Sequence, residues 1–298
     1  MKQPIFTGSS GLNTLVDPAR LQADPAAVPL SRAYNVDHDA TGRVSRRKGC
    51  STTDITSAVH SLWCDGNECF FVTGTSLCRL SPDFSYDVMA TVQGARTSYL
   101  QLDNRVYWVN GYEKGIIENG TNRTWPDSSY SSYDTTITYS PVPAGTMLGY
   151  HGARILIVDG STIWYTGRHH PYGVDKEHGY FLMENAVIMC RPVAEGVWVS
   201  DSTGVYFLQG RTMPSLKPFQ RSSVPAISGT DAVTDLSVLR GFEVSGLGVL
   251  WLSKEGVCAG TADGTMLNLT DGKLAELPVS ERGAGVVIGQ RYVGVLQP

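Results

Sequence analysis

One stretch of the chain gathers side chains that could bind a metal ion or exchange protons. His169, His170 and His178 lie in TGRHHPYGVDKEHGYF together with Asp175 and Glu177, and imidazole and carboxylate groups are common metal ligands and acid–base groups. Neighbouring side chains of an extended segment point to opposite sides, so His169 and His170 would need a special turn to hold one ion. Proline and glycine within the stretch predict a long loop. We therefore expect a solvated loop that contacts a partner, with no metal site and no cofactor.

Motifs that accompany the common catalytic chemistries do not occur in the 298 residues. The sequence contains no GxSxG elbow, HExxH helix, Walker loop or GxGxxG turn. DSTGVYF, at 201–207, matches half of the S-x-D-x-G-x-x-W turn that sialidase-like propellers repeat, and it occurs once. The sequence therefore predicts that the chain is not an enzyme and that it has no catalytic residues.

A basic run is the second candidate contact site. Arg43, Arg46, Arg47 and Lys48 lie within RVSRRKG, in a chain whose net charge is −4 from 24 Lys plus Arg and 28 Asp plus Glu. The overall charge gives no reason to hold a nucleic-acid backbone. The run is either an edge strand guarded by charge or a contact to an acidic partner or to DNA that passes nearby.

The elements that must position these residues are β-strands. The 32 Gly and 15 Pro are spread along the chain, and short runs of Val, Ile, Tyr, Trp and Phe alternate with Gly, Asn or Asp turns. The clearest hairpins lie at 100–111, 149–167, 196–210 and 249–269. No helical period is evident.

These hairpins belong to a loose repeat. Successive units fall on 57–92, 94–127, 144–189, 190–233 and 238–278. The period is close to the roughly 40 to 50 residues of a four-stranded propeller blade. A pair of β-sandwiches and a β-solenoid are the alternative architectures.

The two ends of the chain predict one further blade. Residues 285–297 form one hairpin pattern and 31–53 another, and each lacks the second half of a blade. We therefore expect an all-β, six-bladed β-propeller over 31–298, closed by pairing of the N- and C-terminal hairpins. Residues 1–30 contain prolines and no strand pattern, so they predict an extended N-terminal arm, and their apolar residues favour a docking strap.

Two further features concern the cellular setting. No apolar run reaches the roughly 18 to 20 residues of a membrane span, and the N-terminus lacks the pattern of a secretory signal. We expect synthesis in the cytoplasm and no membrane span. The six cysteines are therefore expected to be free, buried thiols in preference to disulfides.

Two stretches of the sequence resemble a known family. GLNTLVDPARL (11–21) and PLSRAYNVDHDATGRVSRRKGCSTT (29–53) resemble the opening of a group of tailed-bacteriophage structural proteins, in which a glycine-led arm precedes an A-x-N-V-D-x-D-x-x-G-x-x-x-R-x-G hairpin. The matching positions are Ala33, Asn35, Val36, Asp37, Asp39, Gly42, Arg46 or Arg47, and Gly49. The segment 163–210 is similar to the strand pair of the same proteins that ends in G-V-Y-F-L-x-G. Together these stretches cover about a third of the chain.

The resemblance implies a function in the virion tail. Members of the family are propeller-like tail-hub, nozzle and packaged-DNA stabilisation proteins, so the chain is expected to form an oligomeric ring around the DNA channel. Its partners would be further copies of itself and other tail subunits, with packaged DNA passing nearby without specific binding. The alternative is a soluble propeller that acts as a binding module or hydrolase and recognises a glycan or a peptide.

Overall fold

The computed structural model describes residues 9–18, 28–39, 41–49, 55, 57–126, 137–239, 244–278 and 280–297. Strands make up nearly all of its regular structure. The helical segments in this part of the chain are two single 3₁₀ turns, η2 (Met213–Ser215) and η3 (Leu236–Val238). The prediction of an all-β protein is therefore confirmed.

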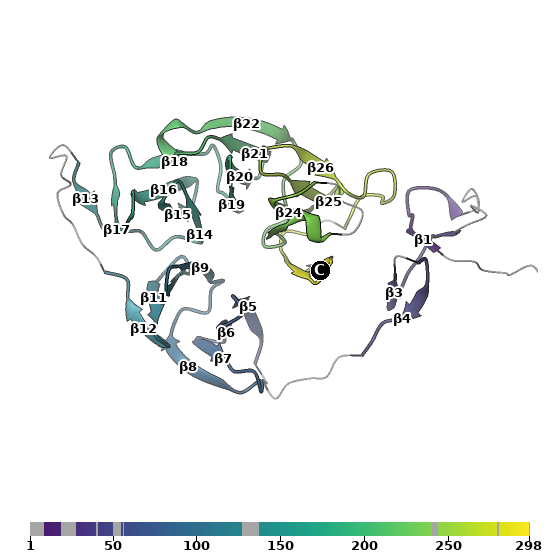
Figure 1. Cartoon of the computed structure of the whole chain (residues 1–298), viewed down its shortest axis with the longest axis horizontal. Helices are drawn as coiled ribbons and strands as arrows, with labels where there is room; N and C mark the ends of the chain where they lie inside the picture. Colours follow the sequence, from purple (N-terminus) through teal and green to yellow (C-terminus); the bar gives the residue numbers. More distant parts are fainter. Residues whose placement is uncertain are drawn as a thin grey trace, which may run out of the picture.

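Five antiparallel sheets follow one another around a common axis (Figure 1). The first contains β5 (Val59–Cys64), β6 (Cys69–Thr73), β7 (Ser76–Leu80) and β8 (Tyr86–Thr91). The second contains β9 (Ser98–Leu102), β10 (Arg105–Val109), β11 (Lys114–Glu118) and β12 (Thr121–Thr124). The third contains β13 (Tyr139–Ser140), β14 (Met147–His151), β15 (Arg154–Asp159), β16 (Thr162–Gly167), β17 (His170–Asp175) and β18 (Tyr180–Leu182).

The fourth and fifth sheets complete the series. The fourth contains β19 (Met189–Val193), β20 (Gly196–Asp201), β21 (Gly204–Gln209) and β22 (Lys217–Ser222). The fifth contains β23 (Ala232–Asp235), β24 (Leu247–Ser253), β25 (Gly256–Gly260) and β26 (Met266–Asn268). These five blades correspond to the five predicted repeat units with two exceptions: β13 lies before the predicted third unit, and β23 belongs to the fifth blade and not to the end of the fourth.

Neighbouring blades pack face to face, which buries both sides of their middle strands. All six residues of β20 are buried, and so are six of the seven residues of β24. Tryptophans join the blades: the indole of Trp125 donates to the carbonyl oxygen of Pro171 at 2.9 Å, and that of Trp198 donates to Thr261 O at the same distance. A Cβ at Gly260 would lie 2.4 Å from the Trp198 ring, so the close approach of the fourth and fifth blades requires glycine there.

The predicted sixth blade is wrong: the described residues form five blades. The C-terminal hairpin, β27 (Gly283–Ile288) with β28 (Arg291–Leu296), is a separate two-stranded sheet, as is the N-terminal hairpin of β3 (Val36–His38) and β4 (Val44–Arg46). The C-terminal hairpin packs against the fifth blade instead. Val287 and Tyr292 join the apolar cluster of that blade, and the Tyr292 hydroxyl donates to Thr230 O at 2.5 Å.

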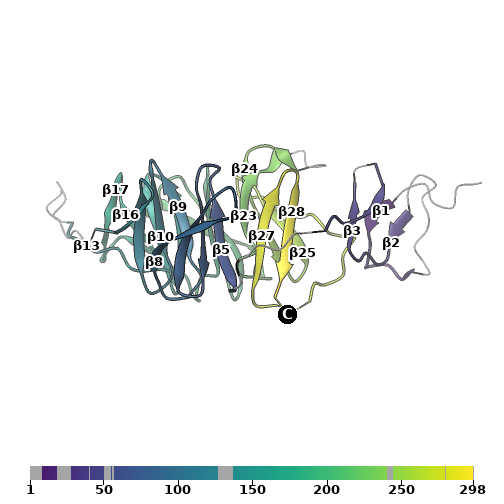
Figure 2. The ribbon, with the colours of Figure 1, turned by 90° about the horizontal axis from the view of Figure 1, so that it is seen from below.

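The N-terminal hairpin belongs to a small module outside the ring (Figure 2). We call β1 to β4 the N-terminal module, since β1 (Ser9–Leu12) pairs in parallel with β2 (Val28–Leu30) and the Ser9 amide donates to Gly42 O at 2.7 Å. The expectation that 1–30 holds no strand is therefore wrong for these segments; Ile5, Phe6 and Leu21 lie outside the described residues. The module contacts the rest of the chain at two places: the Thr14 amide donates to Lys273 O at 2.9 Å, and Asp37 of β3 forms an ion pair with Arg291 of β28 at 3.6 Å.

The cysteines correct a further expectation. Cys64 and Cys69 are paired across the β5–β6 hairpin and form a disulfide, with their Cα atoms 4.2 Å apart. Opposite positions in a hairpin place two side chains within reach of each other, so the register of β5 and β6 brings the two thiols together whatever the compartment. Cys78, Cys190 and Cys258 are free and buried as predicted, and Cys50 lies outside the described residues.

The packing of the C-terminal hairpin on the fifth blade gives a prediction for stability. Tyr292→Ala removes a partly buried ring and a hydrogen bond, so it is expected to lower the free energy of unfolding by about 2 to 4 kcal/mol. Val295 lies on the same hairpin but is 61% exposed, and Val295→Ala should change it by less than about 0.5 kcal/mol. Urea unfolding of dilute protein, followed by tryptophan fluorescence, measures both. Equal effects of the two substitutions would show that the hairpin does not dock as described.

Candidate binding surfaces

A hollow of about 350 Å³ opens between the second and third blades. Three turns meet around it: the turn between β9 and β10, the turn between β14 and β15, and the turn between β16 and β17. Its lining combines aromatic, imidazole and charged side chains with a smaller apolar share. The residues are Leu102, Asp103, Arg105, Tyr107, Tyr150, Ala153, Ile155, Thr166, His169, His170, Pro171 and Tyr172.

Each of the three turns contains a non-glycine residue in the left-handed backbone region. The φ angles are 54° at Asp103, 63° at Ala153 and 55° at His169. The His169 amide donates to Ala153 O at 2.8 Å, which holds two of these turns together. Such conformations cost energy outside glycine and persist where the surrounding structure fixes them, often at functional sites. Their convergence marks the hollow as a candidate site.

The turn at His169 also explains how two consecutive histidines line one hollow. The predicted long loop at 166–181 is wrong, because β16, β17 and β18 occupy most of it. The left-handed residue His169 ends the turn and His170 begins β17, so the simple alternation of an extended segment does not apply across this pair. Pro171 is held in place by the hydrogen bond from Trp125.

Hydrogen bonding and burial set the charge states in the hollow. Arg105 donates from Nε to Glu118 Oε1 at 2.8 Å and from Nη1 to the Tyr172 hydroxyl at 2.6 Å. The bond to Glu118 raises the pKa of Arg105 and lowers the pKa of Glu118. Burial raises the pKa of Tyr107 to about 12 and lowers the pKa of His170. At neutral pH the hollow therefore offers the neutral Tyr107 hydroxyl and the neutral His170 imidazole beside a paired guanidinium.

The arrangement is suited to binding more than to bond cleavage. Asp103 is the one carboxylate among the residues that line the hollow, whereas glycoside hydrolysis commonly uses two carboxylates on either side of the scissile bond. The described residues contain no group of three or more His, Cys, Asp or Glu side chains placed to hold a metal ion.

His178 is separated from the other two histidines. Its side chain is 80% exposed, and Nδ1 lies 3.4 Å from Asp175 Oδ2. Asp175 Oδ1 accepts hydrogen bonds from the backbone amides of Glu177 and His178, which closes the turn after β17. The polar cluster read from the sequence is therefore split: His169 and His170 line the hollow, and His178 lies on a surface turn.

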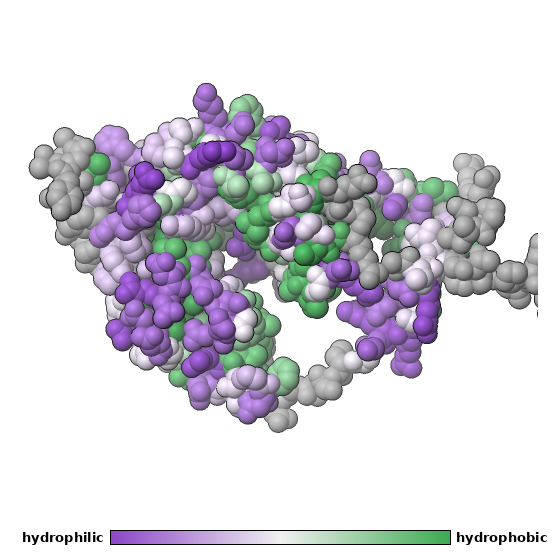
Figure 3. Space-filling model, viewed as in Figure 1, coloured by the Kyte–Doolittle hydropathy of each residue, from purple (hydrophilic) through white to green (hydrophobic). Residues whose placement is uncertain are grey.

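The basic run lies on the N-terminal module. β4 ends at Arg46, and Arg43, Arg46, Arg47 and Lys48 are all exposed. None of these four makes an ion pair with any residue that the structure describes. Figure 3 shows hydrophilic surface over this module. The four cations are thus available to a partner.

A third surface is the position where a sixth blade would lie. On the C-terminal hairpin, the face turned away from the fifth blade exposes Val286, Ile288 and Val295. The first blade has a matching feature: its face turned away from the second blade exposes Val59, Leu62, Tyr86 and Val88. The space-filling view shows hydrophobic surface on both sides of this open position (Figure 3). The alternation of apolar residues in the sequence does not reveal this open surface, because both faces of these strands are apolar and only one is covered.

Comparisons with known proteins identify the fold and nothing narrower. No family model and no curated protein matches the chain. A crystal structure of BBS1N in complex with ARL6DN superposes with a TM-score of 0.54 at 7% identity, over 85% of this chain and 80% of that one. A gluconolactonase from Xanthomonas campestris gives 0.48 at 13% identity, over 82% and 88%. PorZ of Porphyromonas gingivalis gives 0.43 at 15% identity, and 81% of this chain spans 29% of PorZ.

The likeness agrees with the β-propeller fold described above. At such low identity a structural likeness shows the fold alone. As for membranes, none of the helical segments in the described ranges has the length and apolar character that crossing a bilayer demands.

Proposed function

We propose that the chain is a structural subunit of a bacteriophage tail, without catalytic activity, that assembles with copies of itself into a ring around the DNA channel. The observation that carries this proposal is the open sixth position. A soluble monomer rarely leaves facing apolar sheet surfaces uncovered, and such surfaces mark sites of protein–protein contact.

The N-terminal module is the part of a neighbouring copy that fits this position. It carries the short hairpin β3–β4, which makes no strand pairing with a blade of its own chain and touches the C-terminal hairpin through the Asp37–Arg291 ion pair. Val36 and Val44 of this hairpin are only partly buried. Its exposed basic run would approach a subunit whose net charge is negative, which favours association. Exchange of a terminal element between copies is a common route to closed oligomers.

The resemblance of residues 11–21, 29–53 and 163–210 to phage tail proteins gives the proposal its biological setting. The described part of the first two stretches lies in the N-terminal module and the third spans β16 to β21. The resemblance therefore includes the segment that would reach a neighbour, together with strands of the third and fourth blades, which lie away from the open position.

Size-exclusion chromatography with light scattering, together with electron micrographs, tests the assembly. The full chain is expected to form one discrete ring-shaped oligomer at micromolar concentration. Placing two charges on the open apolar face, as Ile288→Asp with Val295→Asp, should give folded monomers, because the desolvation cost of a buried carboxylate is several kcal/mol. Tyr112→Asp, at an exposed turn residue away from that face, is the matched control and should leave the oligomer unchanged. A wild-type chain that stays monomeric, or a doubly charged variant that still forms the ring, contradicts the proposal.

A second candidate function is supported by the hollow between the second and third blades. Exposed Tyr150 beside Tyr172, His169 and Asp103 offers the aromatic surface and hydrogen-bonding groups that bind a glycan or an extended peptide. This second function is that of a soluble binding module. It does not include glycoside hydrolysis, which commonly uses two carboxylates, because the hollow is lined by one.

Titration of the full chain with oligosaccharides and peptides, followed by NMR of methyl and aromatic signals, tests the second function. Binding should shift signals around the hollow, and Tyr150→Ala should weaken it at least about tenfold through loss of the stacking surface. The control Tyr112→Ala should bind as the wild type does. Absence of any saturable shift, or equal binding by Tyr150→Ala, would exclude this function.

A further inference from the structure

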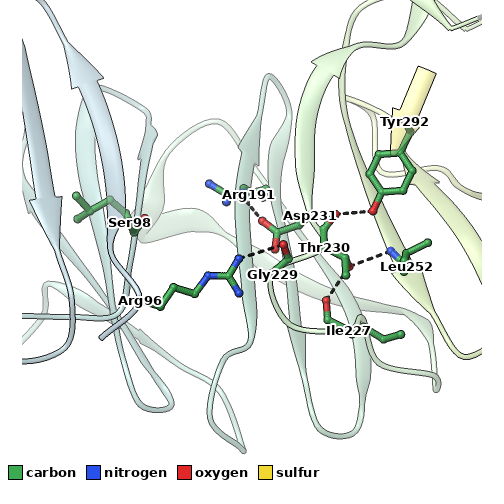
Figure 4. A network of polar contacts seen from close by, with 10 residues as sticks. Arg96, Ser98, Arg191, Ile227, Gly229, Thr230, Asp231, Leu252 and Tyr292 are labelled. Atoms are coloured by element: carbon green, nitrogen blue, oxygen red, sulfur yellow. Dashed lines mark hydrogen bonds and ion pairs between the residues drawn. The ribbon is translucent and has the colours of Figure 1, made fainter. Parts of the chain in front are cut away.

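Charged side chains from three parts of the chain meet near the propeller axis (Figure 4). Arg96 precedes β9 of the second blade, Arg191 lies on β19 of the fourth, and Asp231 precedes β23 of the fifth. Arg191 Nε donates to Asp231 Oδ2, and Asp231 is only 9% exposed. This pair joins two neighbouring blades and satisfies the carboxylate.

Arg96 reaches the same place from across the ring. Its Nη2 donates to the backbone oxygen of Gly229 at 3.1 Å. A Cβ at Gly229 would lie 1.6 Å from Arg96 Nη1, and the φ of Gly229 is +80°. Only glycine allows both this backbone conformation and the close approach of the guanidinium. The local backbone is therefore shaped around the Arg96 head group.

The cluster holds more positive than negative charge. Arg282, which precedes β27, is the third cation, and neither Arg96 nor Arg282 forms an ion pair with a described residue. Burial lowers the pKa of Arg96, the positive charges of Arg191 and Arg282 act in the same direction, and Asp231 opposes them. Arg96 and Arg191 thus lie beside one carboxylate, which already receives a hydrogen bond from Arg191. The backbone of Arg282 is bridged to Ser228, the residue before Gly229.

We propose that this axial cluster is a binding site for a small oxyanion of the phosphate or carboxylate type. The planar guanidinium of Arg96 donates one hydrogen bond to the Gly229 carbonyl oxygen, and its further N–H groups can donate to an anion. Hydrogen bonds between guanidinium and oxyanion are among the strong ones because both partners are charged. An anion there would offset the unbalanced charge.

Calorimetric titration of the full chain with inorganic phosphate and, separately, with succinate tests the site. Ionic strength is held constant with sodium chloride, so that screening alone gives no signal. We expect saturable binding of at least one of the two anions, and comparison of the two distinguishes a phosphate from a carboxylate ligand. Arg96→Gln should weaken binding at least about tenfold. Arg221→Gln, which removes an exposed cation of β22 at the rim, should change it less than about twofold.

Two further variants guard against a folding artefact. Gly229→Ala keeps every charge but places a methyl group where the Arg96 head group lies, so it should weaken binding as Arg96→Gln does. Arg282→Gln alters an exposed side chain and is expected to leave the thermal transition unchanged while reducing affinity. Failure of both anions to bind at millimolar concentration overturns the proposal. The proposal is also overturned if Arg282→Gln and one of the other two axial variants, Arg96→Gln or Gly229→Ala, both bind the anion as the wild type does. An equal loss of affinity in the control Arg221→Gln overturns it as well.

Discussion

The structure depends on one constraint: a sheet that is apolar on both faces must be covered on both faces. Between neighbouring blades this need is met by face-to-face packing, in which Trp125 and Trp198 bridge from one blade to the next. At the ends of the series it is not met. The C-terminal hairpin covers the fifth blade with one face and exposes Val286, Ile288 and Val295 on the other. The assembly that we propose, in which a second copy covers the open faces, would meet this constraint.

The same packing positions the two candidate ligand sites. Docking of Trp125 on Pro171 fixes the start of β17 and so brings His169 and His170 to the hollow between the second and third blades. At the axis, the close approach of the innermost strands brings Arg96 within hydrogen-bonding distance of Gly229, 133 residues further along the chain. Rigid sheets thus gather polar groups from distant segments, and the two candidate sites lie in the turns and at the axis.

Local patterning was enough to predict the strands and their grouping into blades. Glycine and aspartate turns between alternating apolar runs fixed the hairpins at 100–111 and 196–210, which the structure contains as β9–β10 and β20–β21. Strands β1 and β2 were missed because four and three residues are too few to show a period. The disulfide of Cys64 and Cys69 was missed because the cellular compartment alone predicts free thiols. The register of the β5–β6 hairpin, which places the two cysteines opposite each other, predicts the reverse.

The failures at longer range have a different cause. The apolar alternation of 285–297 fits a hairpin whose edge pairs with another strand, and it fits equally a hairpin whose face packs on a sheet. The sequence pattern therefore does not distinguish closure with 31–53 from docking on the fifth blade. His169 and His170 were singled out correctly by residue type, but the left-handed turn that brings both to the hollow gives no signal in the sequence. The axial cluster gives no signal in the sequence either, because nothing in the residues around Arg96 indicates that Asp231 lies close to it in the fold.

Amide hydrogen exchange of the C-terminal hairpin, measured over a range of protein concentrations, tests the central claim most directly. If the open sixth position is filled by a second copy, the amides of 283–297 should exchange more slowly as concentration rises, whereas those of the buried strand β20 should not change. Exchange at 283–297 that is independent of concentration, in protein shown to be folded, would contradict the account.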